Sequence, residues 1–489
     1  MARTTWRSKL AQYQHVVLDA SAEVSSAHAS ISRRQWRAVL RIRFWGTRGS
    51  LAKPGPATLR YGGNTSCVEV TARDGTLIVL DCGTGAHELG QHLAASREPP
   101  ICGHLLITHT HWDHIQGFPF FTPLFARGNE WDVYAPQGVG KRVEDTLAGQ
   151  MEYSYFPVGL RQLGATIRYH ELVEGAFDVG EVRVTARYMN HPGLAMGYRL
   201  EAGGVALVYA TDHEPHSPHQ PDAPRRAGAP ALPVHREDRE HIEFLAGADL
   251  VIHDAQYELL EYPTKRTWGH SPAELAVDWA LAGGVKRLAL FHHDPLRTDE
   301  AVDRIVEICR RRAAASGRGL DVFGAAEGQV IELARPAVSM PRDSPAGSTA
   351  PPGRLDDAPP SATVLIVDDD PDIVRLLMLT LEPEGFRLLS ATDGDAALAI
   401  ARAQRPDLLL LDWNMPGKDG LQVCRALRAE ADVRLREVPV VLLTGQTEAD
   451  HTAAGFAAGV TDYVTKPFKP SHVVARVHAW LLRNRRREA

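Results

Sequence analysis

The sequence lacks several features that would place a protein in a specialised class. No apolar run among its 489 residues reaches eighteen, so no membrane-spanning helix is expected. The N-terminus carries no apolar core of the signal-peptide kind, which leads us to expect a cytoplasmic protein without a membrane partner. Only five cysteines are present and none forms a CxxC pair, which disfavours both a disulfide framework and a cysteine zinc site.

An excess of charge of one sign is also missing. Lys and Arg number 54 against 60 Asp and Glu, and a net charge of −6 does not favour a protein that mainly grips nucleic-acid backbones. Histidine, in contrast, is plentiful. There are 22 histidines, and 19 of them precede residue 335, so we expect imidazole-based chemistry in the first part of the chain.

Composition divides the chain into four parts. Residues 335–361 are rich in Pro, Ser, Ala and Gly and carry few large apolar side chains, which predicts a disordered linker. Residues 1–40 form a basic extension without a recognisable motif, for which a docking helix is the less favoured interpretation. Two folded domains are expected at 41–334 and 362–489, in line with a length of about 150 residues per domain.

The strongest motif of the first domain is LLITHTHWDHIQG. An apolar run ends at Thr108 and is followed by His109, His111, Asp113 and His114. Ligand-type side chains packed this densely cannot all serve one tetrahedral ion, so the spacing predicts two neighbouring metal ions. Imidazole and carboxylate together favour Zn²⁺, with Mn²⁺ or Fe as alternatives.

Three further apolar runs of this domain also end in a ligand-type residue. His191 follows VRVTARYMN, Asp212 follows VALVYAT, and His292 follows RLALF. A single such residue is more often structural. Four strand ends that each offer ligands within one α/β domain indicate instead a shared metal centre.

With these motifs, residues 41–334 resemble the metallo-β-lactamase fold hydrolases, and within them the tRNase Z-like and cyclic phosphodiesterase branch. The matching segments are RFWGTRGS, RYGGNTSCVEV, LDCGTG, HTHWDH, MNHPG, YATD, IHDAQY, GHS and VKRLALFHH. The resemblance implies an α/β fold in which two packed sheets are covered by helices, an αββα sandwich.

The resemblance also implies roles for individual residues. It assigns one ion to His109, His111 and His191, the second to Asp113, His114 and His292, and a bridging position to Asp212. It places a catalytic histidine at His270. Asp113 is expected to orient the attacking hydroxide, Asp81 to fix the ligand loop, and His253 to support the site.

The ligand types narrow the substrate. Asp212 stands where a cysteine would favour β-lactam hydrolysis, and His111 where a glutamate would favour diiron redox chemistry. Residues 138–180 are not notably basic, although a tRNA-cutting relative would carry a basic arm. We therefore expect a small or cyclic nucleotide-type phosphodiester as substrate. The alternatives are an RNA or DNA nuclease of the tRNase Z type, and a non-catalytic metal-binding sensor or adaptor.

Several histidines are not expected to be ligands. His213, His216 and His219 lie in the Pro-rich stretch TDHEPHSPHQPD, which predicts a loop of solvated side chains. His293 follows the ligand His292 on a strand and should therefore point to the opposite side.

The second domain alternates apolar strands with helical segments, which predicts a doubly wound parallel sheet. Polar side chains stand at its strand ends, namely Asp368 with Asp369, then Asp412, Thr444 and Lys466. Carboxylates brought together in this way need a hard cation between them, and Mg²⁺ suits such a site.

Residues 362–485 resemble the flavodoxin-like receiver domain of response regulators. The resemblance implies that Asp412 accepts a phosphoryl group and that Asp368, Asp369, Asp412 and the carbonyl of Asn414 bind Mg²⁺. It implies further that Thr444 and Lys466 contact the phosphoryl oxygens and that Tyr463 is the aromatic switch. The partner would be a sensor histidine kinase or a phosphotransfer protein, and the receiver could dock on the first domain or form a homodimer. The whole chain is then expected to be a two-component response regulator with a hydrolase as its output.

Overall fold

The computed structural model describes most of both predicted domains. The described residues are 38–137, 142–216, 235–334, 362–445, 458–466, 468, 470, 473–474 and 476–481. Nearly all of the predicted basic extension and the whole predicted linker, residues 335–361, lie outside these ranges.

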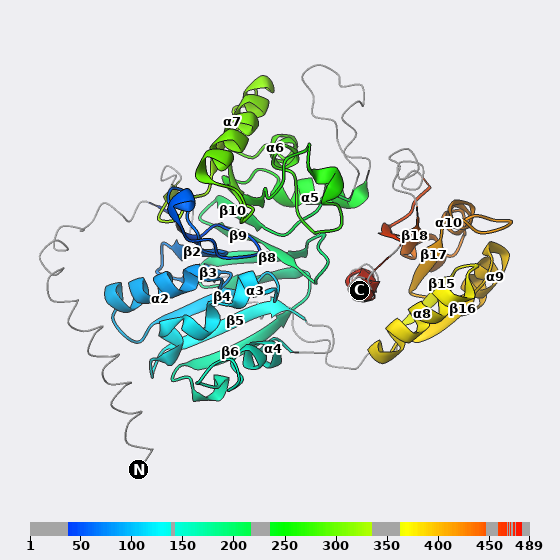
Figure 1. Ribbon diagram of the computed structural model, residues 1–489, viewed down its shortest axis with the longest axis horizontal. Coiled ribbons are helices and arrows are strands. Elements are labelled where there is room, and N and C mark those ends of the chain that lie inside the picture. Colours follow the sequence, from blue (N-terminus) through cyan, green and yellow to red (C-terminus); the bar gives the residue numbers. More distant parts are fainter. Residues whose placement is uncertain are drawn as a thin grey trace, which may run out of the picture.

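Two sheets packed face to face form the centre of the first domain (Figure 1). The first sheet has the strand order β14 (Val330–Leu333), β1 (Leu40–Gly46), β2 (Cys67–Ala72), β3 (Leu77–Leu80), β4 (Cys102–Leu106), β5 (Glu130–Pro136) and β6 (Thr166–Leu172). The second has the order β13 (Asp321–Gly324), β12 (Arg287–Phe291), β11 (Leu250–Asp254), β10 (Val205–Ala210), β9 (Met196–Ala202), β8 (Val182–Tyr188) and β7 (Gly175–Val179).

The sheets meet in a core to which both contribute. Phe44 and Val70 of the first sheet belong to the same buried cluster as Leu200 and Tyr209 of the second. This burial explains why alternate residues of β1 and nearly all residues of β10 are apolar, since strands covered on both faces need apolar side chains throughout.

Helices cover the outer faces of this sandwich. The helices α2 (Gly85–Ser96), α3 (Trp112–Ile115) and α4 (Val143–Gln150) accompany the first sheet, and α5 (Arg236–Leu245), α6 (Ala273–Ala282) and α7 (Asp299–Ala315) accompany the second. Short 3₁₀ turns lie at Pro56–Thr58, Phe118–Phe120, Thr122–Phe125, Leu160–Gln162 and Tyr262–Thr264. The predicted αββα sandwich is confirmed.

The second domain is a single parallel sheet with helices on both faces. Its strand order is β16 (Arg387–Ala391), β15 (Thr363–Val367), β17 (Leu408–Asp412), β18 (Val440–Thr444) and β19 (Asp462–Thr465). Its helices are α8 (Pro371–Leu381), α9 (Gly394–Gln404), α10 (Gly420–Arg428) and α11 (Val433–Glu437), with a 3₁₀ turn at Glu382–Glu384 and a further helical stretch at 476–481. The predicted doubly wound fold is confirmed as well.

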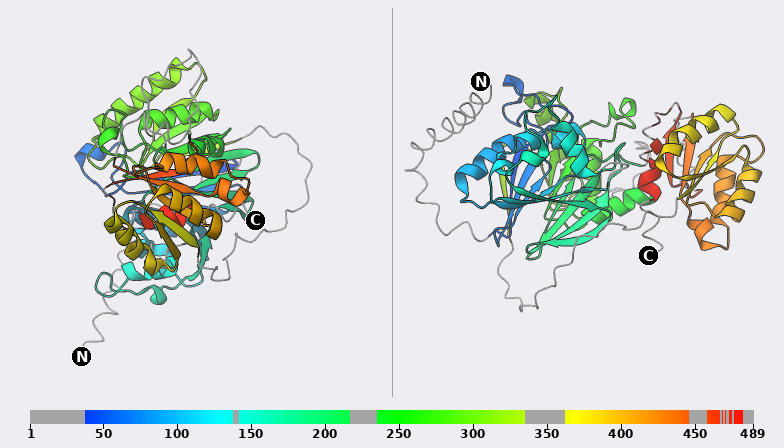
Figure 2. Two further views of the ribbon diagram at one scale, coloured as in Figure 1. Left: turned by 90° about the vertical axis from the view of Figure 1, so that its right-hand side faces the viewer. Right: turned by 90° about the horizontal axis from the view of Figure 1, so that it is seen from below.

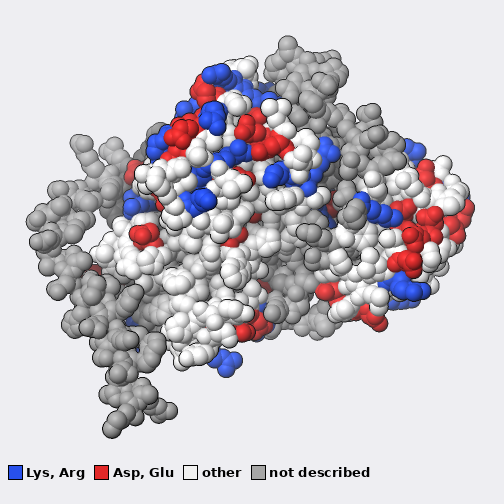
Figure 3. All heavy atoms as spheres, viewed as in Figure 1, with Lys and Arg blue, Asp and Glu red and all other residues white. Residues whose placement is uncertain are grey.

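The two domains lie side by side, and the second presents β19 and residues 476–481 to the first (Figures 1 and 2). His235, which directly precedes α5, contacts Thr461 of the second domain at this boundary. On the face drawn in Figure 3, described Lys and Arg side chains mix with Asp and Glu over the helices of the first domain, without a continuous basic surface. No helix in the described part of the chain is long and apolar enough to span a membrane.

Candidate metal centre and carboxylate site

The predicted ligands of the first domain come together where the strands of both sheets end. His109 and His111 follow β4, Asp113 and His114 lie in α3, His191 follows β8, Asp212 follows β10, and His292 follows β12. Asp81, Asp212 and His292 adopt left-handed backbone angles, with φ of 59°, 55° and 60°. This conformation is costly for a residue other than glycine and is found mainly where a side chain must be aimed at a functional site.

Asp212 lies between two groups of ligand-type side chains. Its Oδ1 is 3.8 Å from Nε2 of His109 and 3.9 Å from Nε2 of His191. Its Oδ2 is 3.2 Å from Nε2 of His114 and 3.4 Å from Nε2 of His292. The two oxygens of one carboxylate therefore face two different groups, an arrangement that allows the carboxylate to be shared by two ions.

The two groups are those expected from the sequence. Ligand-type atoms of His109, His111 and His191 lie within 4.8 Å of one another, and so do those of Asp113, His114 and His292. His191 Nε2 is 3.2 Å from His111 Nδ1, and His292 Nε2 is 3.2 Å from Asp113 Oδ2. Each group is thus compact enough for its members to share one ion.

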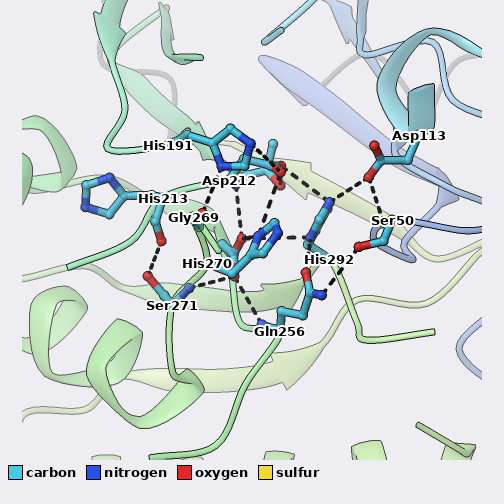
Figure 4. Close-up of polar contacts among 12 residues, drawn as sticks. Ser50, Asp113, His191, Asp212, His213, Gln256, Gly269, His270, Ser271 and His292 are labelled. Carbon is cyan, nitrogen blue, oxygen red and sulfur yellow. Dashed lines mark hydrogen bonds and ion pairs between the residues drawn. The ribbon is translucent and has the colours of Figure 1, made fainter. Parts of the chain in front are cut away.

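Hydrogen bonds at the far ring nitrogens hold the imidazoles in place. Nδ1 of His114 bonds Oδ2 of Asp81 at 2.8 Å, and Nδ1 of His292 bonds Oε1 of Gln256 at 2.9 Å. Nδ1 of His191 donates to the carbonyl of Gly269 at 3.0 Å (Figure 4). Protein metal sites orient their histidines in this way, which leaves Nε2 to bind the ion.

The chemistry of the donor set fits a pair of divalent cations. Nε2 of His109 is buried and has no hydrogen-bond partner among the described residues. Burial lowers the pKa of His109 well below its usual range and that of His191 to about 3, so both rings offer a neutral lone pair. Burial lowers the pKa of His114, but the negative charges of Asp113 and Asp212 outweigh it and raise the pKa.

Asp81 and Asp113 hold the ligand loop at two further points. Asp81 accepts hydrogen bonds from the backbone N–H of Thr108 at 2.7 Å and from the hydroxyl of Tyr209 at 2.8 Å. Asp113 Oδ2 accepts the backbone N–H of Ser50 at 2.7 Å. Both carboxylates are therefore fixed by groups from other strands and loops.

His270 forms a buried pair with Asp254 beside the metal ligands. Its Nδ1 lies 2.7 Å from Oδ2 of Asp254 and 3.8 Å from Oδ1 of Asp212 (Figure 4). Burial alone would lower the pKa of His270, but the charge and hydrogen bond of Asp254 outweigh it and raise the pKa to about 9. The ring therefore lies beside the ligand groups with its Nδ1 bound to Asp254.

His253 supports this pair from behind rather than touching the ligands. Its Nδ1 donates to the carbonyl of Asp254 at 2.7 Å, and its Nε2 is 2.9 Å from Nε2 of His241. His293 points away from the centre, and its Nε2 donates to the carbonyl of Ala325 at 3.0 Å.

The second domain gathers its carboxylates around one lysine. Nζ of Lys466 donates to Oδ1 of Asp412 at 2.5 Å and to Oδ2 of Asp368 at 2.7 Å. The backbone N–H of Asn414 donates to Oδ2 of Asp412 at 2.9 Å. Burial raises the pKa of Asp412, and the charge of Lys466 opposes this effect.

The remaining predicted residues of this site stand around the same sheet edge. Asp369 is exposed after β15, and Thr444 is buried at the end of β18. The rings of Tyr463 and Trp413 stack with centroids 6.2 Å apart. Since Trp413 follows Asp412 directly, the aromatic pair connects β19 to the proposed acceptor.

Comparison with protein families decides the identity of both domains. The family described as "Beta-lactamase superfamily domain" matches residues 76–293, and that described as "Response regulator receiver domain" matches residues 364–478. The chain carries a β-lactamase superfamily domain followed by a response regulator receiver domain. Both predicted resemblances are thereby confirmed.

Individual relatives match one domain at a time. The receiver domain is 46% identical over 121 residues to the DNA-binding response regulator MtrA of Mycolicibacterium smegmatis, which covers 25% of this chain and 51% of that protein. The chain thus spans about half the length of the curated relatives it matches. The metallo-β-lactamase fold protein YhfI of Bacillus subtilis aligns with 60% of this chain and 98% of its own, at 18% identity and a TM-score of 0.41. Human tRNase Z, short form, aligns with 60% of this chain and 99% of its own, at 20% identity and the same TM-score.

One prediction for the β-lactamase superfamily domain is wrong. His213 and the side chain of His216 are buried, with 2% and 3% of their surface exposed, rather than solvated. The His213 ring stacks on that of His241 at 3.8 Å, and His216 bonds Asp238 at 3.1 Å. Helix α5 supplies both partners from more than twenty residues further along the chain, so local composition could not reveal the burial. The third histidine, His219, lies outside the described residues.

Sequence reasoning also missed two residues that contact the predicted site. Asp254 binds His270, and Gln256 binds His292, and both belong to the segment IHDAQY. From that segment only His253 was predicted to support the site, whereas the contacts to His270 and His292 are made by Asp254 and Gln256. An acidic residue at the end of β11, between the ends of β10 and β12, was the available signal.

Proposed function

We propose that the β-lactamase superfamily domain is a dinuclear metal-dependent phosphodiester hydrolase whose activity is set by phosphorylation of the receiver domain. The observation that carries this proposal is Asp212. Its two oxygens face two ligand groups, and the His270–Asp254 pair stands beside it. A binding module would need the ligands but has no evident use for a second, proton-donating pair.

The seven ligand residues described above would hold two divalent cations, Zn²⁺ being favoured by the imidazole and carboxylate donors and Mn²⁺ or Fe being alternatives. Such a pair lowers the pKa of a bound water and neutralises phosphoryl oxygens. Asp113, fixed by Ser50 and bonded to His292, would orient the attacking oxygen and accept its proton. A phosphorus–oxygen bond to this water forms as the ester bond to the leaving alcohol breaks.

His270 would protonate the departing alcohol oxygen. Because Nδ1 is bound to Asp254, the other ring nitrogen is the one available to give a proton. Asp254 is in turn fixed by the backbone N–H groups of Ser271 and Gln256, each at 3.1 Å. This arrangement keeps the imidazole in one orientation and stabilises the protonated ring from which the proton is given.

Two exposed tryptophans favour a nucleotide-type substrate. Trp112 directly follows His111 with 73% of its surface exposed, and Trp268 stands two residues before His270 with 58% exposed. Aromatic rings that remain in solvent beside a site can stack on a base, whatever its identity. Mixed surface charge on the face in Figure 3 fits a small or cyclic nucleotide-type phosphodiester better than a long polyanion.

Asp412 would receive its phosphoryl group from a sensor histidine kinase or a phosphotransfer protein. The donor's bond to phosphorus breaks as the bond from an Asp412 oxygen forms. Mg²⁺ would be held by Asp368, Asp369, Asp412 and the carbonyl of Asn414. Lys466 and Thr444 would contact the transferred oxygens, and Tyr463 would respond to them as the switch residue.

A panel of phosphodiesters tests the proposal, run on Zn²⁺- and Mn²⁺-loaded full chain with and without a small-molecule phosphoryl donor. We expect turnover of at least one nucleotide-type diester, loss of turnover in His111→Ala, and no donor effect in Asp412→Ala. Metal binding without turnover of any diester would overturn the hydrolase and support a sensor. Steeply salt-dependent binding and cleavage of RNA would show a nuclease instead.

A further inference from the structure

The receiver domain contacts the β-lactamase superfamily domain through a residue next to a predicted metal ligand. The guanidinium of Arg476, in the helical stretch 476–481, donates to the side-chain oxygen of Asn190, which directly precedes His191. A second contact lies nearby, where Nε2 of His235 donates to the carbonyl of Thr461 at 3.1 Å. Arg476 is largely buried there, with 14% of its side chain exposed.

Asn190 and Glu214 are joined by two hydrogen bonds, in which each residue donates once and accepts once. Its side-chain amide donates to the carbonyl of Glu214 at 2.7 Å, and the backbone N–H of Glu214 donates to the carbonyl of Asn190 at 2.8 Å. A displacement of Asn190 therefore moves His191 on one side and Glu214 on the other.

The carboxylate of Glu214 reaches the loop that carries His270. It accepts the backbone N–H groups of Thr267 at 2.7 Å and Gly269 at 2.8 Å. The loop is tight, because a side chain at Gly269, where φ is 88°, would come within 2.2 Å of Nδ1 of His191. Gly269 also accepts the hydrogen bond that orients His191, so this network fixes a metal ligand and the loop of the proton donor together.

On the receiver side, Arg476 is tied to the strand that leads to the phosphorylation site. It donates to Oδ2 of Asp462 at 2.9 Å, and the same oxygen accepts the indole N–H of Trp480 at 2.8 Å. Asp462 begins β19, and Lys466 follows the end of this strand. Three residues of β19 thus separate Asp462, the anchor of Arg476, from the lysine bound to Asp412.

We propose that Arg476 is the positioning residue through which the receiver acts on the metal centre, along the route Lys466, β19, Asp462, Arg476, Asn190 and Glu214. A phosphoryl group on Asp412 provides new oxygen acceptors for Lys466. The hydrogen bonds that Lys466 makes to Asp412 and Asp368 are therefore rearranged. The inference rests on the proposed hydrolase function, but it concerns which contact transmits the signal. Energetic coupling of this kind is carried by an element whose equilibrium both sites bias, and the proposal assigns this role to β19 with Arg476.

The test uses the full chain with beryllofluoride as a phosphoryl mimic, in wild type, Arg476→Ala, Arg476→Lys and the control Arg402→Ala. Arg402 is an exposed arginine of α9 that bonds Glu430 within the receiver. Two readouts are taken, namely phosphodiester turnover and hydrogen exchange of peptides covering 188–216 and 262–271. A phosphate-affinity gel with a phosphoryl donor checks that Asp412 still accepts a phosphoryl group.

In wild type and Arg402→Ala, we expect the mimic to change turnover by about 5- to 150-fold, the range of typical allosteric couplings, and to change exchange in both segments. In Arg476→Ala both responses fall to within about twofold of no change, whereas Asp412 is still phosphorylated. Arg476→Lys keeps the charge without the forked geometry and should retain part of the response. A full response in Arg476→Ala would overturn the inference. If no diester is turned over by wild type, the proposed hydrolase fails, while hydrogen exchange still decides the route.

Discussion

The two polar centres of this chain differ in what offsets the negative charge of their carboxylates. In the receiver domain a built-in cation, Lys466, bonds both Asp368 and Asp412. In the β-lactamase superfamily domain no Lys or Arg makes a described ion pair with Asp113 or Asp212, and the neighbours of these carboxylates are imidazoles. In the receiver a lysine of the protein itself offsets part of the negative charge, whereas in the other centre bound cations would do so.

The difference extends to the surroundings of each site. Imidazoles of the metal centre are oriented by partners at their far nitrogens, such as Asp81 and Gln256, which fix the direction of each ring. The receiver instead holds its carboxylates with a flexible side chain that can change partners. A rigid centre suits bond cleavage, and an adjustable one suits a switch.

The largest effect on the difference between the two centres is expected from removal of Asp212, the proposed shared ligand. We expect Asp212→Ala to lower turnover by about 10³-fold or more. Without the shared carboxylate at least one ion is lost, and with it the stabilisation of charge in the transition state. Metal analysis of the purified protein should show fewer than two ions per chain. Asp249→Ala, which removes a partly exposed carboxylate paired with Lys286, serves as the control. Two tightly bound ions and normal turnover in Asp212→Ala would refute the bridging role.

The next largest effect is expected at His270. His270→Ala should lower kcat by about 10²- to 10⁴-fold, the range of general acid catalysis, while two ions remain bound. Asp254→Asn should cause a smaller loss by the same route, because the imidazole keeps its position but loses the neighbouring charge. A substrate whose leaving group needs no proton, such as a p-nitrophenyl ester, should be affected least. Equal losses on both kinds of ester would argue against proton donation.

A weaker effect is expected from the residue that orients His114. Asp81→Ala should reduce metal affinity by about 10- to 100-fold, as is usual when the hydrogen-bond partner of a ligating histidine is removed. Competition with a chelator measures this change directly. Turnover at saturating metal should recover, in contrast to Asp212→Ala. If saturating metal restored nothing, Asp81 would act in catalysis or folding rather than by orienting the ligand.

The sequence allowed prediction of both folds and of the residues that surround Asp212, because ligand-type side chains that follow several strands of one α/β domain indicate a shared site. It did not reveal which side chains from neighbouring loops would pair with them. Asp254 was overlooked because its partner His270 is sixteen residues away. The burial of His213 depends on α5, and the contact of Arg476 with Asn190 joins residues 286 positions apart. Such long-range contacts arise from the packing of whole elements, which local patterns do not encode.

The smallest expected effect concerns the exposed Trp268 and tests whether the metal centre acts on a nucleotide-type substrate. If Trp268 stacks on a base, Trp268→Ala should raise KM for a nucleotide-type diester by about fivefold, since stacking contributes about 1 kcal/mol. kcat should hardly change, because the ring does not touch the reacting bond. A diester without an aromatic group provides the matched comparison, and its KM should stay the same. An equal rise in KM for both substrates would mean that Trp268 shapes the loop of His270 instead, since Gly269 and His270 follow it directly.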